Sequence, residues 1–230
     1  MAKVADQKIK VIWENNELLV INKPAGVVTT REKQVDNKNI YLEDWIKTNK
    51  PNGLPREGIV HRLDKGTSGI VAIAKTKSAL SDLKTQFKNR TVKKKYMALV
   101  EGDFPFEAEI NMPIKRSNYG FDKFGVNEEG KQAITLIKLV DKYKKENRIY
   151  SLVEVGLKTG RTHQIRVHLS YLKWPIVGDK LYGSKTVLGR PFLHAGELTV
   201  ELPGVGEKKV FKAELPEELL ELLRSYEKIN

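Results

Sequence analysis

Apolar residues in this chain occur mostly in short runs separated by polar turns, a pattern that is typical of strands. The segment KVIWENNELLVINKPAG holds two such runs on either side of a polar turn at 14–17, followed by a Pro/Gly turn at 24–26. It predicts two strands joined by a short turn. A continuous apolar run at 70–74 predicts a buried strand. Segments rich in β-forming residues predict further strands at 96–100, 132–140, 148–155 and 192–202.

Apolar residues at helical spacing predict four helices among these strands. The first lies near 42–47, before a Pro-Asn-Gly turn, and the second is expected to be capped by Ser78. The third covers 165–172, and the fourth starts at Pro216. The expected apolar faces are Leu80, Leu83 and Phe87 in the second helix and Leu215, Leu219, Leu222 and Tyr226 in the fourth. The elements predict a single α+β domain over residues 1–230, without repeats or a linker.

Composition narrows the class of protein. The chain has 230 residues, 40% hydrophobic and 30% charged, which is ordinary for a folded domain. No apolar run reaches the roughly 18 residues that a membrane span needs, and the first ten residues lack the apolar core of a signal peptide. The absence of cysteine excludes disulfides, thiolate catalysis and cysteine-containing zinc sites. A cytoplasmic protein without a membrane interaction is expected.

Positive charge is concentrated in one part of the sequence. The formal net charge is +12, and ten basic residues stand against two acidic ones from Val60 to Val100. Such a segment on a folded scaffold is typical of a polyanion partner such as nucleic acid. A lysine-rich surface that only contacts solvent is the alternative.

Several catalytic and cofactor motifs are missing. The sequence has no GxxxxGK[ST] phosphate loop and no GxSxG elbow, and its Gly-Val-Gly at 204–206 lacks a third glycine. The histidines are His61, His163, His168 and His194. His163 and His168 would point about 140° apart on a helix, so they are poorly placed to share a metal. No cofactor and no metal are expected.

One carboxylate stands out in the segment HRLDKGTSG, residues 61–69. Asp64 lies between Arg62 and Lys65, and Gly66 and Gly69 would let another chain approach closely. Neighbouring cations favour the ionised carboxylate that a nucleophile or base requires. The alternative is that Asp64 caps a turn or pairs with Arg62.

A second group of candidates lies in KTGRTHQIRVH, residues 158–168. Gly160 is expected to precede a helix whose free amides, with Arg161, suit a phosphate, while Thr162 and Arg166 would share one helix face. Ordinary surface arginines are the alternative. Tyr96 follows three lysines, Lys93, Lys94 and Lys95, a pairing that suits base stacking beside phosphate contacts, although a core tyrosine fits equally well.

Taken together, these segments resemble the RluA-type pseudouridine synthase family over nearly the whole chain. HRLDKGTSG is the most specific element, and KTGRTHQIRVH follows it about 95 residues later. The other matching segments, in order, are ENNELLVINKPAGVVT, KKYMALVEG, GKQAIT, PIVGDKLYG and FLHAGEL.

The resemblance implies roles for four residues. Asp64 would be the catalytic aspartate, Arg166 would form an ion pair with it, and Tyr96 would stack on the target base. Arg62 would enter the RNA helix and fill the space left by the flipped nucleotide. The implied fold is a curved, mainly antiparallel mixed sheet with flanking helices and a central active-site cleft.

The sequence departs from the family pattern at both ends. The catalytic pattern starts by about Ile9, so we expect no separate N-terminal RNA-binding domain of the kind that many relatives carry. We therefore expect RNA selection by the catalytic domain, through the basic segment 84–95. Val200-Glu201-Leu202-Pro203 replaces the usual aromatic-x-His-Pro, so the residue under the target base is left unassigned.

The expected function is isomerisation of uridine to pseudouridine in ribosomal RNA of the large subunit, in transfer RNA, or in both. Asp64 would attack C1′ or remove a proton from C2′, and both routes stay open. RNA is the only partner implied, and a monomer is expected. The alternatives are a non-catalytic RNA-binding module on the same fold and a different nucleic-acid enzyme, such as a hydrolase. The second is disfavoured because no metal-binding carboxylate cluster lies near HRLD.

Overall fold

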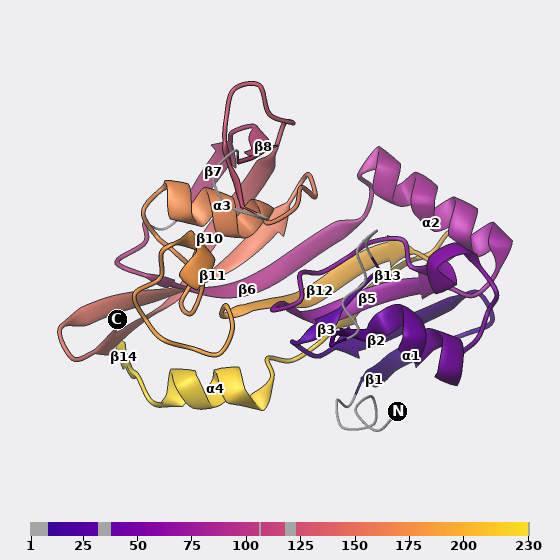
Figure 1. Cartoon of the computed structure of the whole chain (residues 1–230), viewed down its shortest axis with the longest axis horizontal. Coiled ribbons are helices and arrows are strands. Elements are labelled where there is room, and N and C mark those ends of the chain that lie inside the picture. The colour runs from indigo at the N-terminus through magenta and orange to yellow at the C-terminus, as the bar shows by residue number, and fades with distance from the viewer. Residues whose placement is uncertain (1–8, 32–37, 106, 118–122, 230) are drawn as a thin grey trace. The chain divides into compact units, whose positions relative to one another are not determined.

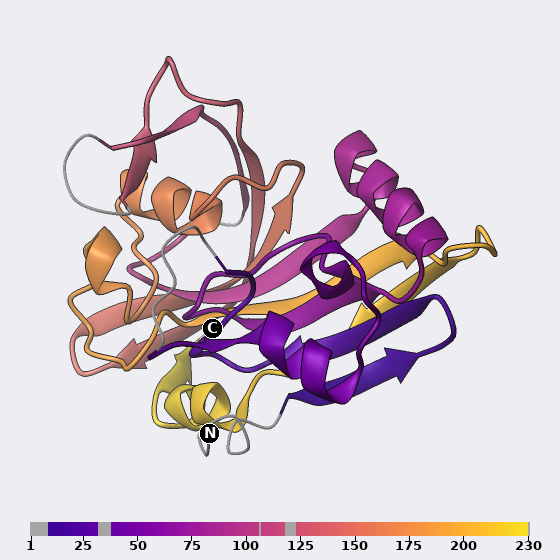
Figure 2. The same ribbon diagram turned by 45° about the vertical axis from the view of Figure 1, so that its right-hand side comes forward.

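The computed structural model describes residues 9–31, 38–105, 107–117 and 123–229, and it divides into two compact units (Figures 1 and 2). The first unit comprises residues 1–93 and 195–214, and the second comprises 94–194 and 215–230. Residues 1–8, on which the expectation of no signal peptide partly rests, lie outside the described residues.

The first unit is built on a sheet in the order β1-β2-β5-β12-β13. Its strands are β1 (Lys10–Glu14), β2 (Leu18–Lys23), β5 (Ser68–Ala74), β12 (Leu193–Glu201, in this unit from Ala195 on) and β13 (Lys208–Lys212). A short parallel pair joins β3 (Val27–Val28) to β4 (Ile40–Tyr41). All seven residues of β5 are buried, which confirms the strand predicted from the apolar run.

Helices α1 (Leu42–Asn49) and α2 (Lys77–Asn89) and the 3-10 turn η1 (Pro55–Gly58) complete this unit. Leu80 and Leu83 of α2 are buried in a core with residues of β2, β5, β12 and β13. The cap predicted at Ser78 is wrong. Thr76 caps α2 instead, because its hydroxyl accepts a hydrogen bond from the amide of Ala79 at 3.1 Å.

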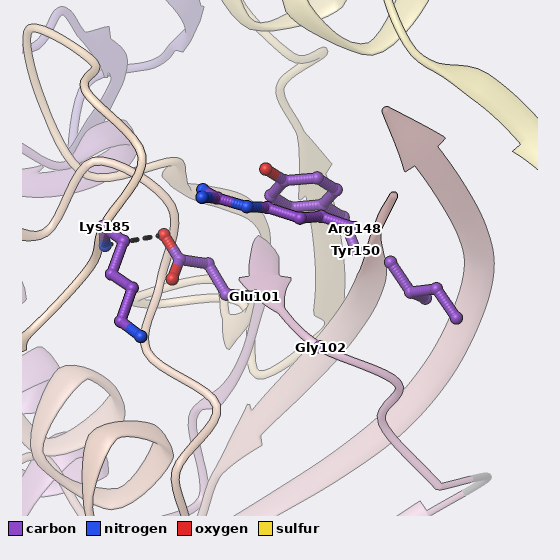
Figure 3. A pocket seen from close by; sticks show the side chains of 6 residues that line it. Glu101, Gly102, Arg148, Tyr150 and Lys185 are labelled. Carbon is purple, nitrogen blue, oxygen red and sulfur yellow. Dashed lines mark hydrogen bonds between the residues drawn. The ribbon is translucent and has the colours of Figure 1, made fainter. Parts of the chain in front are cut away.

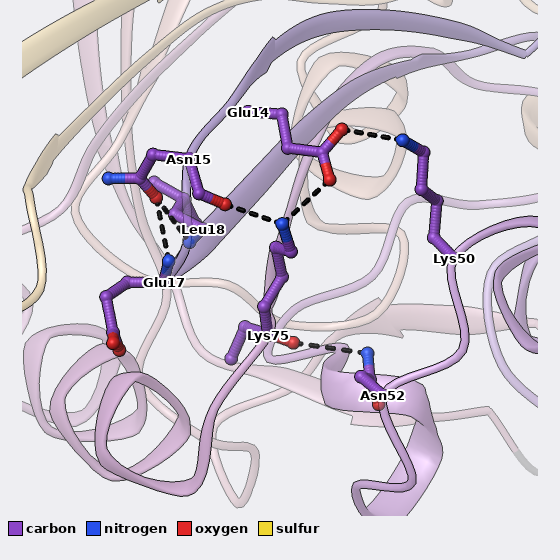
Figure 4. Close-up of polar contacts among 8 residues, drawn as sticks. Glu14, Asn15, Glu17, Leu18, Lys50, Asn52 and Lys75 are labelled. Atoms are coloured by element: carbon purple, nitrogen blue, oxygen red, sulfur yellow. Dashed lines mark hydrogen bonds and ion pairs between the residues drawn. The ribbon is translucent and has the colours of Figure 1, made fainter.

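The turn between β1 and β2 is fixed by polar side chains (Figure 4). The Asn15 side-chain oxygen accepts from the amides of Glu17 and Leu18 at 2.9 and 2.8 Å. Glu14 accepts from Lys50 at 2.7 Å and from Lys75 at 2.8 Å. These two lysines hold the pKa of Glu14 below its usual value, Lys50 having the larger effect. The polar turn expected at 14–17 is thus held in place by hydrogen bonds and ion pairs.

The second unit has a sheet in which β6, β11 and β10 follow one another, all antiparallel. Both β7 and β14 pair with β10, and β8 pairs with β9. The bounds are β6 (Lys93–Glu101), β7 (Glu107–Asn111), β8 (Ile114–Arg116), β9 (Phe124–Val126), β10 (Ile134–Lys145), β11 (Arg148–Leu157) and β14 (Glu227–Ile229). The strands predicted near 96–100, 132–140 and 148–155 are confirmed, although β10 begins later and extends further.

Helices α3 (Gln164–Tyr171) and α4 (Glu217–Arg224) and the 3-10 turn η2 (Lys180–Tyr182) belong to the second unit. In α4, Leu219 is buried as predicted, whereas the predicted Leu222 is half-buried and its neighbour Leu223 is buried. Tyr226, just after the helix, is buried as expected. None of the helices described is long and apolar enough to cross a membrane.

Candidate active site

The segment around Asp64 is a loop fixed by hydrogen bonds on both sides of the aspartate. The Thr29 hydroxyl donates to the carbonyl of Leu63 at 2.7 Å and accepts from its amide at 3.1 Å. On the other side, Thr67 donates its amide to the carbonyl of Asp64 at 3.0 Å, which closes a tight turn. Gly26 donates to the carbonyl of Lys65 at 2.7 Å. The loop therefore holds a half-buried carboxylate on a backbone with little freedom.

Gly69, at the end of the same motif, allows close packing within the chain. It has φ of 124°, and a Cβ there would lie 2.3 Å from the carbonyl oxygen of Ala195. No larger residue fits this position without moving the neighbouring backbone. We predicted that glycines here let another chain approach closely, and at Gly69 it is this chain's own β12 that does so.

The basic residues near Asp64 have different surroundings. Arg62 and Lys65 are exposed, and Lys65 donates to the side-chain oxygen of Asn39 at 2.8 Å. His61 is structural, since its Nε2 accepts from the amide of Ala72 at 2.9 Å and its ring stacks on Phe87. Arg62 and Lys65 are thus the exposed basic residues of this segment, on either side of the half-buried Asp64.

Arg166, in the second unit, forms a nearly buried two-point ion pair with Asp179. Its Nε and Nη2 donate to the two carboxylate oxygens at 2.6 and 2.9 Å, and the side chains are 10% and 1% exposed. The Arg166 guanidinium also lies 4.8 Å from the ring centre of Tyr182. The guanidinium is planar, and because Asp179 binds one edge and Tyr182 contacts one face, its orientation is fixed. The predicted ion pair of Arg166 with Asp64 stays a prediction.

Tyr182, the residue under Arg166, is itself held in place. Its hydroxyl accepts from the amide of Phe124 at 3.0 Å and lies 3.0 Å from Nδ1 of His163. Its carbonyl accepts from the Ser170 hydroxyl at 2.6 Å. Asp179 and Tyr182 lie in the segment PIVGDKLYG, which matches the family pattern, but the sequence alone predicted no role for either residue.

The start of α3 differs from the sequence prediction. The helix begins at Gln164 after His163, whose φ is 57°, so Arg161 and Thr162 lie before it and Thr162 does not share a helix face with Arg166. The Gln164 side chain accepts from the amide of Arg161 at 3.0 Å. The free amide expected at Arg161 is therefore wrong, because the Gln164 side chain already accepts its hydrogen bond, while the phosphate contact expected of the Arg161 side chain stays a prediction. The Arg161 guanidinium donates to the carbonyl of Gln132 at 3.0 Å.

Tyr96 and the three lysines before it lie on β6, where successive side chains alternate between faces. Lys93 and Lys95 are exposed, and Lys95 lies 3.4 Å from Glu154. Lys94 shares its face with Tyr96, which is only 7% exposed, and burial lowers the pKa of Lys94. The lysine on the same face of β6 as Tyr96 is thus the half-buried Lys94.

No metal centre is found in the part of the chain that the structure describes, where no three histidine, aspartate or glutamate side chains form a group that could hold an ion. His168 is fully buried and bonded to the Thr135 hydroxyl at 2.8 Å and the Met112 carbonyl at 3.0 Å. Burial lowers the pKa of His168, which favours the neutral ring. His168 is therefore part of the core.

Comparison with known proteins agrees with these motifs. The family model described as RNA pseudouridylate synthase matches residues 17–171, which include Asp64, Tyr96 and Arg166. The chain is 35% identical to the uncharacterized RNA pseudouridine synthase YlyB of Bacillus subtilis, over 96% of this chain and 73% of that protein. It is 36% identical to ribosomal large subunit pseudouridine synthase D of Neisseria meningitidis serogroup A, over 94% of this chain and 60% of that protein.

A solved structure gives the same result for the fold. Human RNA pseudouridylate synthase domain containing 1 superposes with a TM-score of 0.72 at 25% identity, with each chain covered completely. The α+β class with a mainly antiparallel sheet is confirmed.

Proposed function

This chain belongs to the RNA pseudouridylate synthase family, and from that membership we propose that its substrate is ribosomal RNA of the large subunit. The enzyme is an isomerase that converts uridine in RNA to pseudouridine. The N. meningitidis relative is named for the large ribosomal subunit, and this supports the proposed substrate. Transfer RNA, a cytoplasmic location and a monomeric state stay predictions.

Asp64 is the proposed catalytic residue. The reaction breaks the bond from C1′ to N1 of uracil and forms one from C1′ to C5, while a proton leaves C5 and one is gained at N1. The Asp64 carboxylate would either attack C1′, with uracil leaving as an anion, or remove a proton from C2′ to give a glycal. The observation that carries the proposal is the rigid turn at 63–67, which fixes the backbone on both sides of this carboxylate.

Arg166 is proposed to supply a fixed positive charge to the same reaction. Asp179 uses the Nε and Nη2 edge of the guanidinium, so the charge is oriented before substrate arrives. The other role proposed for Arg166 is the ion pair with Asp64 that the resemblance implies. In both cases a guanidinium already aligned avoids the cost of ordering a flexible side chain during the reaction.

The target base must leave its stack before the reaction, at a cost of roughly a few kcal/mol. Stacking on Tyr96 would return about 1–3 kcal/mol, and insertion of Arg62 would fill the vacated space. Arg62 is exposed, as such a residue must be. Lys65, Arg161, Lys93, Lys94 and Lys95 are proposed to contact RNA phosphates, with Lys94 the least exposed of the three neighbouring lysines.

Release of tritium tests the proposal. Large-subunit ribosomal RNA and transfer RNA transcripts labelled with tritium at uracil C5 are incubated with wild type, Asp64→Asn and the control Asp82→Asn, which changes a carboxylate on α2. We expect release by wild type and the control and none by Asp64→Asn, while RNA affinity changes by less than about threefold. Equal loss of RNA binding and turnover would contradict a catalytic role for Asp64. RNA binding without release from any transcript would instead favour a binding module.

A further inference from the structure

A pocket of about 280 Å³ lies within the second unit, where β6 ends and β11 begins (Figure 3). It is lined by Glu101, Gly102, Arg148, Ile149, Tyr150 and Lys185. None of these residues belongs to the site proposed for catalysis. The pocket combines two cationic side chains, one carboxylate and an aromatic ring.

One wall of the pocket is built by Glu101. A single carboxylate oxygen accepts from the Ser184 hydroxyl at 2.7 Å and from the amides of Lys185 and Thr186 at 2.9 and 2.8 Å. Burial alone would raise the pKa of Glu101, but these hydrogen bonds outweigh it and the pKa lies below its usual value. The negative charge of Glu101 is thus used to fix the 184–186 loop, which places Lys185 at the pocket.

The two cations at this pocket have no acidic partner among the residues that the structure describes. Within the described ranges, neither the Arg148 nor the Lys185 side chain forms an ion pair, and both residues are exposed. By contrast, Lys142 pairs with Asp103 at 2.5 Å and Lys228 with Asp141 at 2.7 Å. Figure 3 shows the Arg148 side chain extended toward the loop that carries Lys185.

The hairpin itself adds like charge. In the register of β10 and β11, Lys145 stands directly opposite Arg148. Like charges at opposite positions destabilise a strand pair unless an anion lies between them. Lys145 also lies over the ring of Tyr226, at 4.9 Å from its centre, and that ring packs on Tyr150 at 4.8 Å. Burial raises the pKa of Tyr226 to about 12, so this tyrosine adds no negative charge at neutral pH.

We propose that this pocket binds a phosphate group of the RNA substrate, at a nucleotide other than the target uridine. The proposal rests on the proposed function. The forked guanidinium of Arg148 can donate two hydrogen bonds to one phosphate, and Lys185 adds a second charge. The same chemistry would accept the phosphate of a free mononucleotide. Lys145 across the strand pair favours a longer polyanion, since it extends the positive surface beyond the pocket.

The test compares two double variants with the same loss of charge. Arg148→Gln/Lys185→Gln removes the pocket cations, and Lys208→Gln/Arg224→Gln removes exposed cations that lie near Glu201 and Glu217. Dissociation constants for the full ribosomal transcript are measured over a series of salt concentrations. We expect the pocket variant to bind about tenfold more weakly, with the slope of log K against log salt reduced by about one. The control should change neither value beyond about twofold.

Two further arms identify the source of the phosphate. Uridine monophosphate and inorganic phosphate are titrated into wild type and the pocket variant, and the RNA measurement is repeated with a short stem-loop that keeps only the target uridine and its neighbours. An RNA site predicts that the loss of affinity disappears on the short RNA. Binding of uridine monophosphate that needs Arg148 and Lys185, with unchanged RNA affinity, would overturn the RNA assignment. Equal effects of the two double variants would overturn the pocket as a specific site.

The outcome can be separated from that of the proposed function. Tritium release by wild type with unchanged RNA affinity of the pocket variant would reject the pocket and keep the enzyme. Loss of RNA affinity in that variant, without tritium release by wild type, would keep the pocket as an RNA site and reject the proposed substrate.

Discussion

Replacement of Asp179 by alanine is the sharpest test of how Arg166 is held. Asp179 is 1% exposed, and its two carboxylate oxygens accept hydrogen bonds from Nε and Nη2 of the guanidinium, at 2.6 and 2.9 Å. Breaking such a buried pair by removing one partner costs about 3–5 kcal/mol. We expect a value near the lower limit, about 3 kcal/mol, because the face of Tyr182 still contacts the guanidinium. For a chain of this size that corresponds to a fall in Tm of roughly 6–12 °C.

A double-mutant cycle measures the pair directly by urea unfolding. Arg166→Met alone leaves the Asp179 carboxylate buried without its cation, and should destabilise by a similar amount. Arg166→Met combined with Asp179→Ala removes both charges, so this double variant should be destabilised by clearly less than the sum of the two single changes. The coupling energy is then at least about 2 kcal/mol. The matched control is Asp141→Asn, whose exposed partner Lys228 lies at 2.7 Å; its stability should stay close to that of wild type, because solvent screens this pair.

Kinetics separate a positioning role for Asp179 from a structural one. Asp179→Asn keeps one acceptor oxygen for the guanidinium, so the protein should stay folded at the assay temperature while kcat falls about tenfold or more and KM changes little. Independent effects in the cycle, adding to within about 0.5 kcal/mol, would refute the reasoning about stability. If Asp179→Asn is folded and has the kcat of wild type, the proposal that Asp179 positions Arg166 is refuted.

Two further predictions concern the cores of the units. Burial lowers the pKa of His168 below its usual 6.5, more than its bond to Met112 raises it, so the unfolded chain binds a proton more tightly. The free energy of unfolding should therefore fall as pH drops below about 6.5, by up to about 1.4 kcal/mol per pH unit. Urea unfolding of His168→Gln should lack this dependence on pH. An equal slope in wild type and His168→Gln would contradict the prediction. Gly69→Ala should destabilise by more than about 3 kcal/mol, because its Cβ would lie 2.3 Å from the Ala195 carbonyl oxygen, whereas Gly125→Ala, with open space around it, should not; thermal melting compares them.

Local patterns in the sequence were sufficient to predict most of the helices and strands. The β1–β2 hairpin and β5 follow from apolar runs and turn residues, because burial and turn geometry act on neighbouring positions. Errors arose where a distant contact decides the boundary. Thr76 rather than Ser78 caps α2, and Thr76 also donates to the Glu17 carboxylate, a residue 59 positions away. A pattern of apolar positions carries no information about such a partner.

The start of α3 shows the same limit at the candidate site. Spacing alone placed Arg161 at a free helix terminus and Thr162 one turn before Arg166. In the structure Gln164 fills that position, since its side chain accepts from the Arg161 amide and the Thr159 hydroxyl and donates to the Ile134 carbonyl. A glutamine that folds back onto the turn before its own helix resembles any other polar helix residue in the sequence.

The two side chains proposed to act in the reaction, Asp64 and Arg166, are held in place by residues to which no step of the reaction is assigned. Thr29 fixes the loop of Asp64 from 34 positions away, and Asp179 fixes Arg166 from 13 positions away, each within its own unit. Neither distance matches a helix or strand period, so no periodic pattern could reveal the pairing. The sequence does, however, show polar residues where a core would be expected to be apolar, and burial of such groups requires partners. A buried aspartate such as Asp179 therefore requires a cationic partner, and in this fold that partner is Arg166, the arginine proposed for catalysis.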